Sequence, residues 1–157
     1  MTPENPRYPS LRESFFTAYE ARCRKPTLFP GVTELLAAID RKGLVWGIVT
    51  NKPQEFAEAI AASTPAMARC AIVVGSRPGV PLKPAPVGIL RALKELALKP
   101  EQTLYTGDDR RDIEAGKAAG TSTLLALWGY RPKDADTSLW APDFTASSPE
   151  DIIRLLP

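Results

Sequence analysis

The sequence predicts an α/β protein built on a Rossmann-like parallel sheet. Short apolar runs of strand length alternate along the chain with helical segments of about ten to twelve residues, which is the pattern of βαβ units. The run Leu44–Val49 is almost continuously apolar, as expected for a strand buried on both faces. The length of 157 residues corresponds to about one domain.

The N-terminal part is predicted to be an extended lead-in followed by a helix. Residues 1–10 contain prolines and no periodic pattern, and from Ser10, a plausible N-cap, apolar residues recur at every fourth position. Pro26 and Pro30 then interrupt the chain. We therefore divide the sequence into residues 1–30, the lead-in with one helix, and residues 31–157, the α/β core.

The core elements follow in order, each justified by its apolar pattern. A helix over Val32–Ile39 carries one apolar stripe and stops at Gly43. Apolar runs predict the strands Leu44–Val49, Ala71–Val74, Thr103–Thr106 and Ser122–Leu127. Helical spacing predicts the helices Pro53–Ala62, Pro86–Leu96, Asp109–Ala119 and Pro149–Leu155. The proline-containing stretch between Trp128 and the last helix is predicted to be irregular.

Composition excludes several classes of function. The chain has no histidine, which removes Ser-His-Asp and Cys-His nucleophile systems and His-ligated zinc. A formal net charge of +2 is too small to indicate binding to nucleic acid or to a membrane surface. Cys23 and Cys70 form no metal-binding or redox motif, and no apolar run is long enough to cross a membrane. We expect a cytoplasmic, soluble protein.

Polar clusters follow three predicted strands: Thr50-Asn51-Lys52, then Lys83, then Gly107-Asp108-Asp109. Ligands of open parallel sheets bind just beyond the carboxyl ends of the strands, so these side chains predict a site for phosphate and a divalent metal. Each cluster also has a structural interpretation. Thr50 can cap the following helix, Lys83 can be a solvated loop charge, and Asp108, Asp109 and Asp112 suit a helix N-terminus.

The three clusters, in this order, resemble motifs of the haloacid dehalogenase-like phosphatases. The matching segments are Val49-Thr50-Asn51-Lys52-Pro53, Lys83-Pro84-Ala85-Pro86 and Tyr105-Thr106-Gly107-Asp108-Asp109-Arg110-Arg111-Asp112. The resemblance is to the phosphoglycolate phosphatase group and the related N-acetylmuramic acid 6-phosphate phosphatases. Residues 10–25 resemble the last helix of the family's cap.

The resemblance implies Mg²⁺-dependent hydrolysis of a small phosphorylated metabolite through an aspartyl-phosphate. Thr50, Asn51 and Lys83 would hold the substrate phosphate, and Lys83 and Thr50 would act in catalysis. Asp108 would bind Mg²⁺, supported by Asp109 and Asp112. The default substrate of the group is phosphoglycolate, with a 6-phosphorylated amino sugar as the alternative.

One part of the family pattern is absent. The DxD motif that ends the family's first, central strand supplies the nucleophile, and the one D-x-D here, Asp134-Ala135-Asp136, follows Arg131-Pro132-Lys133 instead of an apolar strand. The first strand and most of the cap are missing with it. We therefore expect a truncated chain, inactive alone. The alternatives are a catalytically dead module that binds a phosphorylated ligand or a protein, and a homodimer formed by strand exchange.

Overall fold

The computed structural model describes residues 5, 7, 10, 27–130 and 136–157. The predicted cap helix over residues 10–25 lies, apart from Ser10, outside the described residues. The helix and strand boundaries below therefore concern the α/β core.

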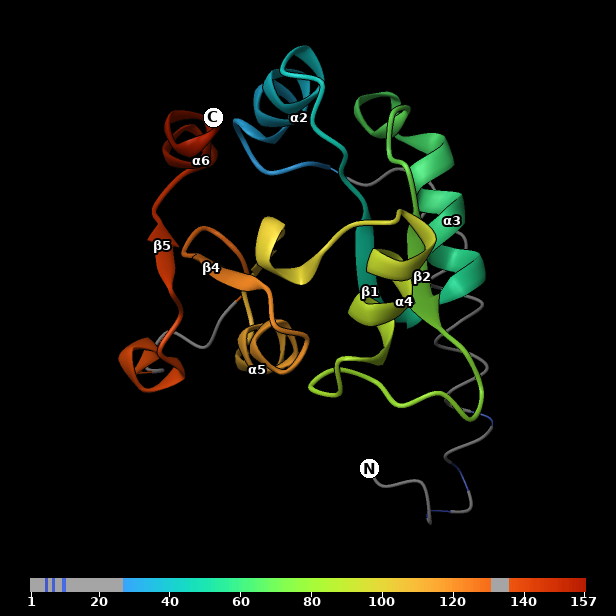
Figure 1. The fold of residues 1–157 in the computed structure, drawn as a ribbon. Helices are drawn as coiled ribbons and strands as arrows, with labels where there is room; N and C mark the ends of the chain where they lie inside the picture. Colours follow the sequence, from blue (N-terminus) through green and yellow to red (C-terminus); the bar gives the residue numbers. More distant parts are fainter. Residues whose placement is uncertain (1–4, 6, 8–9, 11–26, 131–135) are drawn as a thin grey trace.

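Two parallel sheets form the centre of the protein (Figure 1). In the first sheet, β1 (Ile48–Pro53) pairs with β2 (Val73–Ser76). In the second, β4 (Ser122–Ala126) lies between β3 (Leu104–Gly107) and β5 (Phe144–Ala146). β1 and β3 are not hydrogen-bonded neighbours, so the described strands do not form one continuous sheet.

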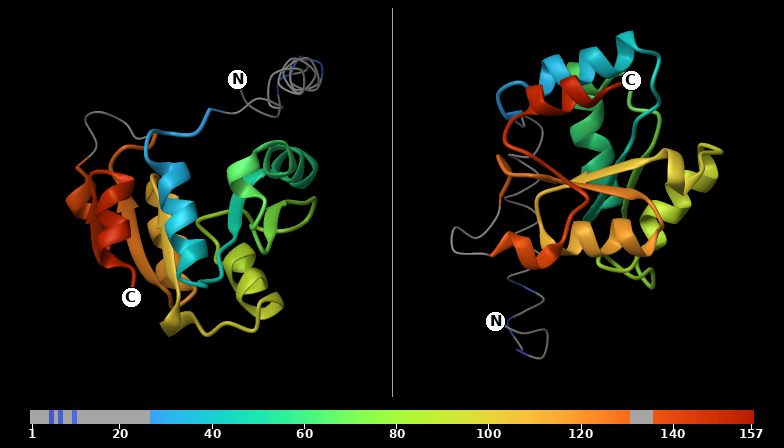
Figure 2. Two further views of the ribbon diagram at one scale, coloured as in Figure 1. Left: turned by 90° about the horizontal axis from the view of Figure 1, so that it is seen from above. Right: turned by 60° about the vertical axis from the view of Figure 1, so that its left-hand side comes forward.

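The helices cover both faces of these sheets. α3 (Gln54–Ser63) and α4 (Val87–Glu95) pack on β1 and β2, and α5 (Arg110–Ala118) packs on β3 and β4. α2 (Val32–Arg41) lies beside α6 (Pro149–Leu155), on the other side of β4 from α5 (Figures 1 and 2). The short 3₁₀ helices are η1 (Pro65–Met67), η2 (Pro100–Gln102) and η3 (Thr137–Trp140).

Two apolar clusters hold these layers together. Leu35, Leu124, Ala146 and Ile152 join α2 and α6 to the β4–β5 side. In the second cluster, α4 and α5 meet directly, and Val49 of β1 and Tyr105 of β3 pack against that contact; its buried members are Ile89, Leu93, Ala115 and Ala119. Packing between α4 and α5 therefore joins the two sheets where backbone pairing does not.

The α/β class and the helix positions predicted from sequence are confirmed, but two strand predictions are wrong in detail. β1 begins at Ile48 instead of Leu44, and it is only half-buried throughout. Among the described strands β1 pairs with β2 alone, so its other edge has no described strand beside it, and Val45 just before it is 55% exposed. The Trp46 indole is instead turned toward α2, where it donates to Asp40 Oδ1 at 3.0 Å.

The second difference is β5, which lies in a stretch predicted to be irregular. Thr123 N and Oγ1 each donate to Asp143 Oδ2 at 2.7 Å, and Asp143 N donates to Thr123 Oγ1 at 3.1 Å. These bonds align the residues after Asp143 with β4. A three-residue strand between prolines is too short for its periodicity to be visible, and only the neighbouring strand specifies it.

Candidate functional site

Lys83 is the central side chain of the candidate site. Its ammonium donates to Asp112 Oδ1 at 2.5 Å, to the Val49 carbonyl at 3.1 Å and to the Tyr105 hydroxyl at 3.2 Å. The Lys83 and Asp112 side chains are only 15% and 9% exposed. Because these partners come from β1, β3 and α5, this one ammonium group connects the two sheets.

The charge state of Lys83 follows from this environment. Burial acts to lower the pKa of Lys83, but the neighbouring Tyr105 and Asp112 outweigh burial and raise that pKa above its ordinary value. Burial also raises the pKa of Tyr105. Lys83 is therefore a fixed positive charge at neutral pH, beside a neutral hydroxyl.

Asn51 fixes the loop that carries Lys83. Its amide nitrogen donates to the Lys83 carbonyl at 3.1 Å, and its Oδ1 accepts from the Lys83 N–H at 2.9 Å. The Thr50 hydroxyl oxygen accepts from Lys52 N at 3.2 Å, which leaves its hydrogen available to donate to a ligand. The last part of β1 thus holds the Lys83 loop and presents one hydroxyl donor.

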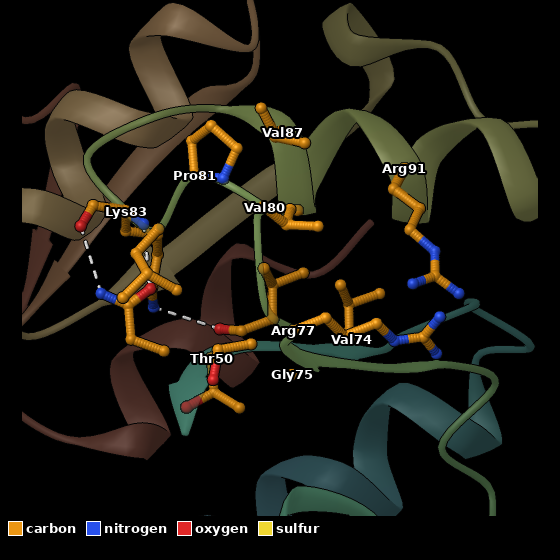
Figure 3. Close-up of a pocket in the computed structure, with 14 residues that line it drawn as sticks. Thr50, Val74, Gly75, Arg77, Val80, Pro81, Lys83, Val87 and Arg91 are labelled. Carbon is orange, nitrogen blue, oxygen red and sulfur yellow. Dashed lines mark hydrogen bonds between the residues drawn. The ribbon is translucent and has the colours of Figure 1, made fainter. Parts of the chain in front are cut away.

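These three predicted phosphate ligands line one pocket of about 170 Å³ (Figure 3). The pocket is bounded by the ends of β1 and β2, by the loop that leads to Lys83 and by the first turns of α4. Among them, Thr50, Asn51 and Lys83 supply a hydroxyl, an amide and an ammonium. The Thr50 hydroxyl and the Asn51 amide, next to the fixed positive charge of Lys83, are suited to bind an anion.

The three aspartates lie at the start of α5 and have different partners. Asp109 is the N-cap of α5, and its oxygens accept from the Arg111 guanidinium at 2.8 and 2.9 Å, which lowers the pKa of Asp109. Asp112 Oδ2 accepts from the backbone N–H groups of Asp108 and Asp109 at 3.2 and 3.1 Å. Asp112 therefore connects the backbone of Asp108 and Asp109 to Lys83, while Asp109 pairs with Arg111 of its own helix.

Asp108 differs from the other two aspartates because one of its carboxylate oxygens accepts no hydrogen bond from the described residues. Its Oδ2 accepts from the backbone N–H of Tyr130, and its other oxygen has no partner among the described residues. Gly129 makes this approach possible, since a Cβ at that position would overlap the Asp108 carboxylate. In the part of the chain that the structure describes, no group of three or more acidic or cysteine side chains gathers in a metal-binding arrangement. Asp108 therefore fits the role of one carboxylate ligand of a magnesium ion, whereas the Asp109 and Asp112 carboxylates already bind protein partners.

One further residue of the site, Tyr105, carried no signal of its own in the sequence. Tyr105 is one residue of a short apolar strand, yet its hydroxyl donates to the Val49 carbonyl at 3.2 Å across the space between β1 and β3. Asp136, the last residue of the D-x-D sequence, caps η3 by accepting from Ser138 N at 3.1 Å and does not line the pocket.

A parallel α/β core with polar groups at the carboxyl ends of its strands defines the Rossmann-like class of α/β proteins. The chain belongs to the haloacid dehalogenase-like hydrolase family, whose model matches residues 3–126. No helix among the described residues is long and apolar enough to span a membrane.

Its relatives in this family include phosphatases. The chain is 36% identical over 156 residues to the N-acetylmuramic acid 6-phosphate phosphatase of Pseudomonas aeruginosa, an alignment that covers 98% of this chain and 68% of the relative. It is 38% identical over 144 residues to the phosphoglycolate phosphatase of Xanthomonas campestris pv. campestris, covering 91% of this chain and 65% of the relative. The chain thus spans about two thirds of the length of these relatives.

Solved structures share the fold. A predicted phosphoglycolate phosphatase from Haemophilus somnus superposes with a TM-score of 0.86 at 24% identity, covering 99% of this chain and 68% of the other. A haloacid dehalogenase-like family protein from Streptococcus pneumoniae gives a TM-score of 0.85 at 23% identity, covering 99% and 71%. At these identities the likeness shows the fold alone.

Proposed function

We propose that this chain forms the phosphate-binding part of a Mg²⁺-dependent phosphomonoesterase that acts on a small phosphorylated metabolite. The observation that carries the proposal is the buried Lys83 ammonium, anchored by Asp112 and Tyr105, beside Thr50 and Asn51 in one pocket. Thr50 and Asn51 bind the phosphate oxygens, and Lys83 stabilises the charge that develops as the phosphoryl group is transferred.

Magnesium would be held by Asp108, through the carboxylate oxygen that has no partner among the described residues. One or two carboxylates, with phosphate oxygens and waters, are the usual ligands of Mg²⁺. When bound, the ion supplies positive charge that offsets the phosphate charge. Asp112 acts as a positioning residue, since it orients Lys83 and the backbone of the Asp108 loop. Asp109 stabilises the start of α5.

The nucleophile is proposed to come from outside these elements. The separation of β1 from β3 supports a further strand between them, carrying the nucleophilic carboxylate of the complete enzyme. The chain alone then binds phosphate without turning over a substrate. The names of the relatives suggest phosphoglycolate or N-acetylmuramic acid 6-phosphate as the substrate. A homodimer in which copies exchange strands would fill the same space.

Titration calorimetry with inorganic phosphate tests the phosphate site. We expect binding by the wild-type chain and a loss of about tenfold or more in affinity for Thr50→Val and for Lys83→Met. Thr50→Val removes a hydrogen bond to a charged group, and Lys83→Met removes the positive charge next to the phosphate. Lys94→Met on the exposed side of α4 is the matched control and keeps wild-type affinity. Absence of phosphate binding by the wild-type chain would contradict the proposal.

A second experiment separates an incomplete enzyme from a chain that works by itself. Phosphate release from p-nitrophenyl phosphate is measured with Mg²⁺ and then with EDTA. No turnover agrees with a nucleophile supplied by another strand or with a binding module. Mg²⁺-dependent turnover that is lost in Asp108→Ala would show that an aspartate of this chain is the nucleophile, and Asp136→Asn would be tested next.

A further inference from the structure

The turn that follows β4 lies directly against Asp108. It is closed by Gly129 N, which donates to the Ala126 carbonyl at 3.3 Å. The next residue, Tyr130, donates its backbone N–H to Asp108 Oδ2. Gly129 lies so close to Asp108 that a Cβ there would overlap the carboxylate. One oxygen of Asp108 is thus bound to this turn, while the other has no partner among the described residues.

Tyr130 is an aromatic residue that is not buried in a core. Its side chain is 84% exposed. The ring contacts that of Phe29, with 5.2 Å between the centroids and an angle of 56° between the ring planes. This separation and this tilt are typical of attractive aromatic pairs. Phe29 therefore holds the part of the turn that donates to Asp108.

Phe29 is itself fixed by the helix that follows it. Its carbonyl accepts from the N–H of Val32, the first residue of α2, at 3.2 Å. Leu35 of α2 is buried in an apolar cluster, and Trp128, two residues before Tyr130, packs against the same cluster. Both rings thus extend from backbone segments that are fixed to one core, which gives their contact a defined position.

We propose that the Phe29–Tyr130 pair positions Asp108 as a magnesium ligand, and that Tyr130 is a positioning residue that acts through its backbone N–H. The bond to Oδ2 leaves the other carboxylate oxygen to the ion and fixes its orientation. Hydrogen-bond partners of this kind orient carboxylates that bind a metal, and they affect metal affinity without touching the ion. This inference rests on the proposed function, in which Asp108 binds Mg²⁺.

Titration with Mn²⁺, followed by the electron paramagnetic resonance signal of the free ion, tests this role, because Mn²⁺ takes the same oxygen ligands as Mg²⁺. We expect Asp108→Asn to remove the binding seen in the wild-type chain. Tyr130→Ala and Phe29→Ala each lower the Mn²⁺ affinity about three- to tenfold, the factor that corresponds to one aromatic contact. The double variant loses no more than the larger single loss. Tyr130→Phe, which keeps the ring, keeps wild-type affinity.

Leu139→Ala is the matched control. Leu139 also lies between β4 and β5 in the chain and is 80% exposed, so this variant removes an exposed apolar side chain and keeps wild-type Mn²⁺ affinity. Titration with inorganic phosphate in the absence of metal distinguishes positioning from a general disturbance of the fold. Tyr130 does not line the phosphate pocket, so Tyr130→Ala keeps wild-type phosphate affinity.

Two kinds of result would overturn the inference. Unchanged Mn²⁺ affinity in Tyr130→Ala, or an equal fall in its affinities for Mn²⁺ and phosphate, would overturn the positioning role and leave the proposed metal site intact. Absence of Mn²⁺ binding by the wild-type chain, or binding that Asp108→Asn does not weaken, would overturn the magnesium site of the proposed function, and this inference with it.

Discussion

Lys83 serves the fold and the proposed phosphate site through the same ammonium group. Its partners Val49, Tyr105 and Asp112 lie on three different elements, and Asp112 depends on Lys83 to balance its buried charge. Removal of one member of a buried pair is costly because the other charge is left uncompensated. A substitution here therefore affects stability and ligand binding together.

Lys83→Met is expected to lower the free energy of unfolding by about 3–5 kcal/mol. Chemical denaturation at pH 7 measures this, with Lys94→Met as the control. Because the pKa of Lys83 is raised, its contribution is fully present below its unfolded value near 10.5 and is lost as the pH rises through the higher folded pKa. A double variant with Asp112→Asn that is no less stable than Lys83→Met would support the pair, whereas additive losses would contradict it.

The Asp143 carboxylate sets part of the acid dependence of stability. Hydrogen bonds from Thr123 lower the pKa of Asp143 below its ordinary value of 3.8. A lowered pKa stabilises the fold above the unfolded value, and this contribution is lost as the pH falls through the folded pKa. In Asp143→Asn, the free energy of unfolding should therefore fall less steeply below pH 4 than in the wild type. Denaturation curves from pH 2 to 7 measure the slope, and an unchanged slope would contradict the assignment.

At the scale of the elements, the turn from β3 into α5 positions the aspartates. Asp109 and Asp112 form a capping box at the start of α5, and Gly107 lies against Asp112 so closely that a Cβ would overlap its side chain. The Asp-rich pattern after an apolar strand predicted this helix start correctly. The sequence did not show that Asp112 would face Lys83, since their contact depends on how α5 and the Lys83 loop pack.

Gly107→Ala tests this turn. We expect a loss of about 1–3 kcal/mol in the free energy of unfolding, because the new methyl group forces Asp112 out of its position. Phosphate affinity should fall as well, since Lys83 loses its anchor. In a Lys83→Met background the same substitution should have a much smaller effect on phosphate affinity, and an undiminished effect would show that Gly107 does not act through Lys83.

At the scale of the whole molecule, the sheet is divided between β1 and β3. β4 has strand neighbours on both sides and Leu124 and Leu125 are fully buried, whereas β1 and β3 each have one neighbour among the described strands. The two halves are held together by the α4–α5 contact and by the Lys83 and Tyr105 bonds to the Val49 carbonyl. The structure thus excludes direct backbone pairing of β1 with β3.

Amide hydrogen exchange tests this division. We expect slow exchange for β4 and faster exchange for the amides of β1 and β3 that lack a backbone partner. Equal protection of all three strands would indicate that another strand covers these edges. Sedimentation would then distinguish strand exchange between copies, which gives a dimer, from a monomer.

The sequence by itself determined the α/β class, the helix positions and the identity of the polar groups at the strand ends, because these depend on local periodicity and on the residue types that end strands. The tertiary structure decided where β1 begins, that β5 exists, and that Tyr105 and Asp112 meet Lys83. It also decided that Arg77, which follows β2, and Arg91 of α4 line the same pocket as Thr50. These features join residues far apart in the chain, and no local pattern encodes a contact made only when two elements pack.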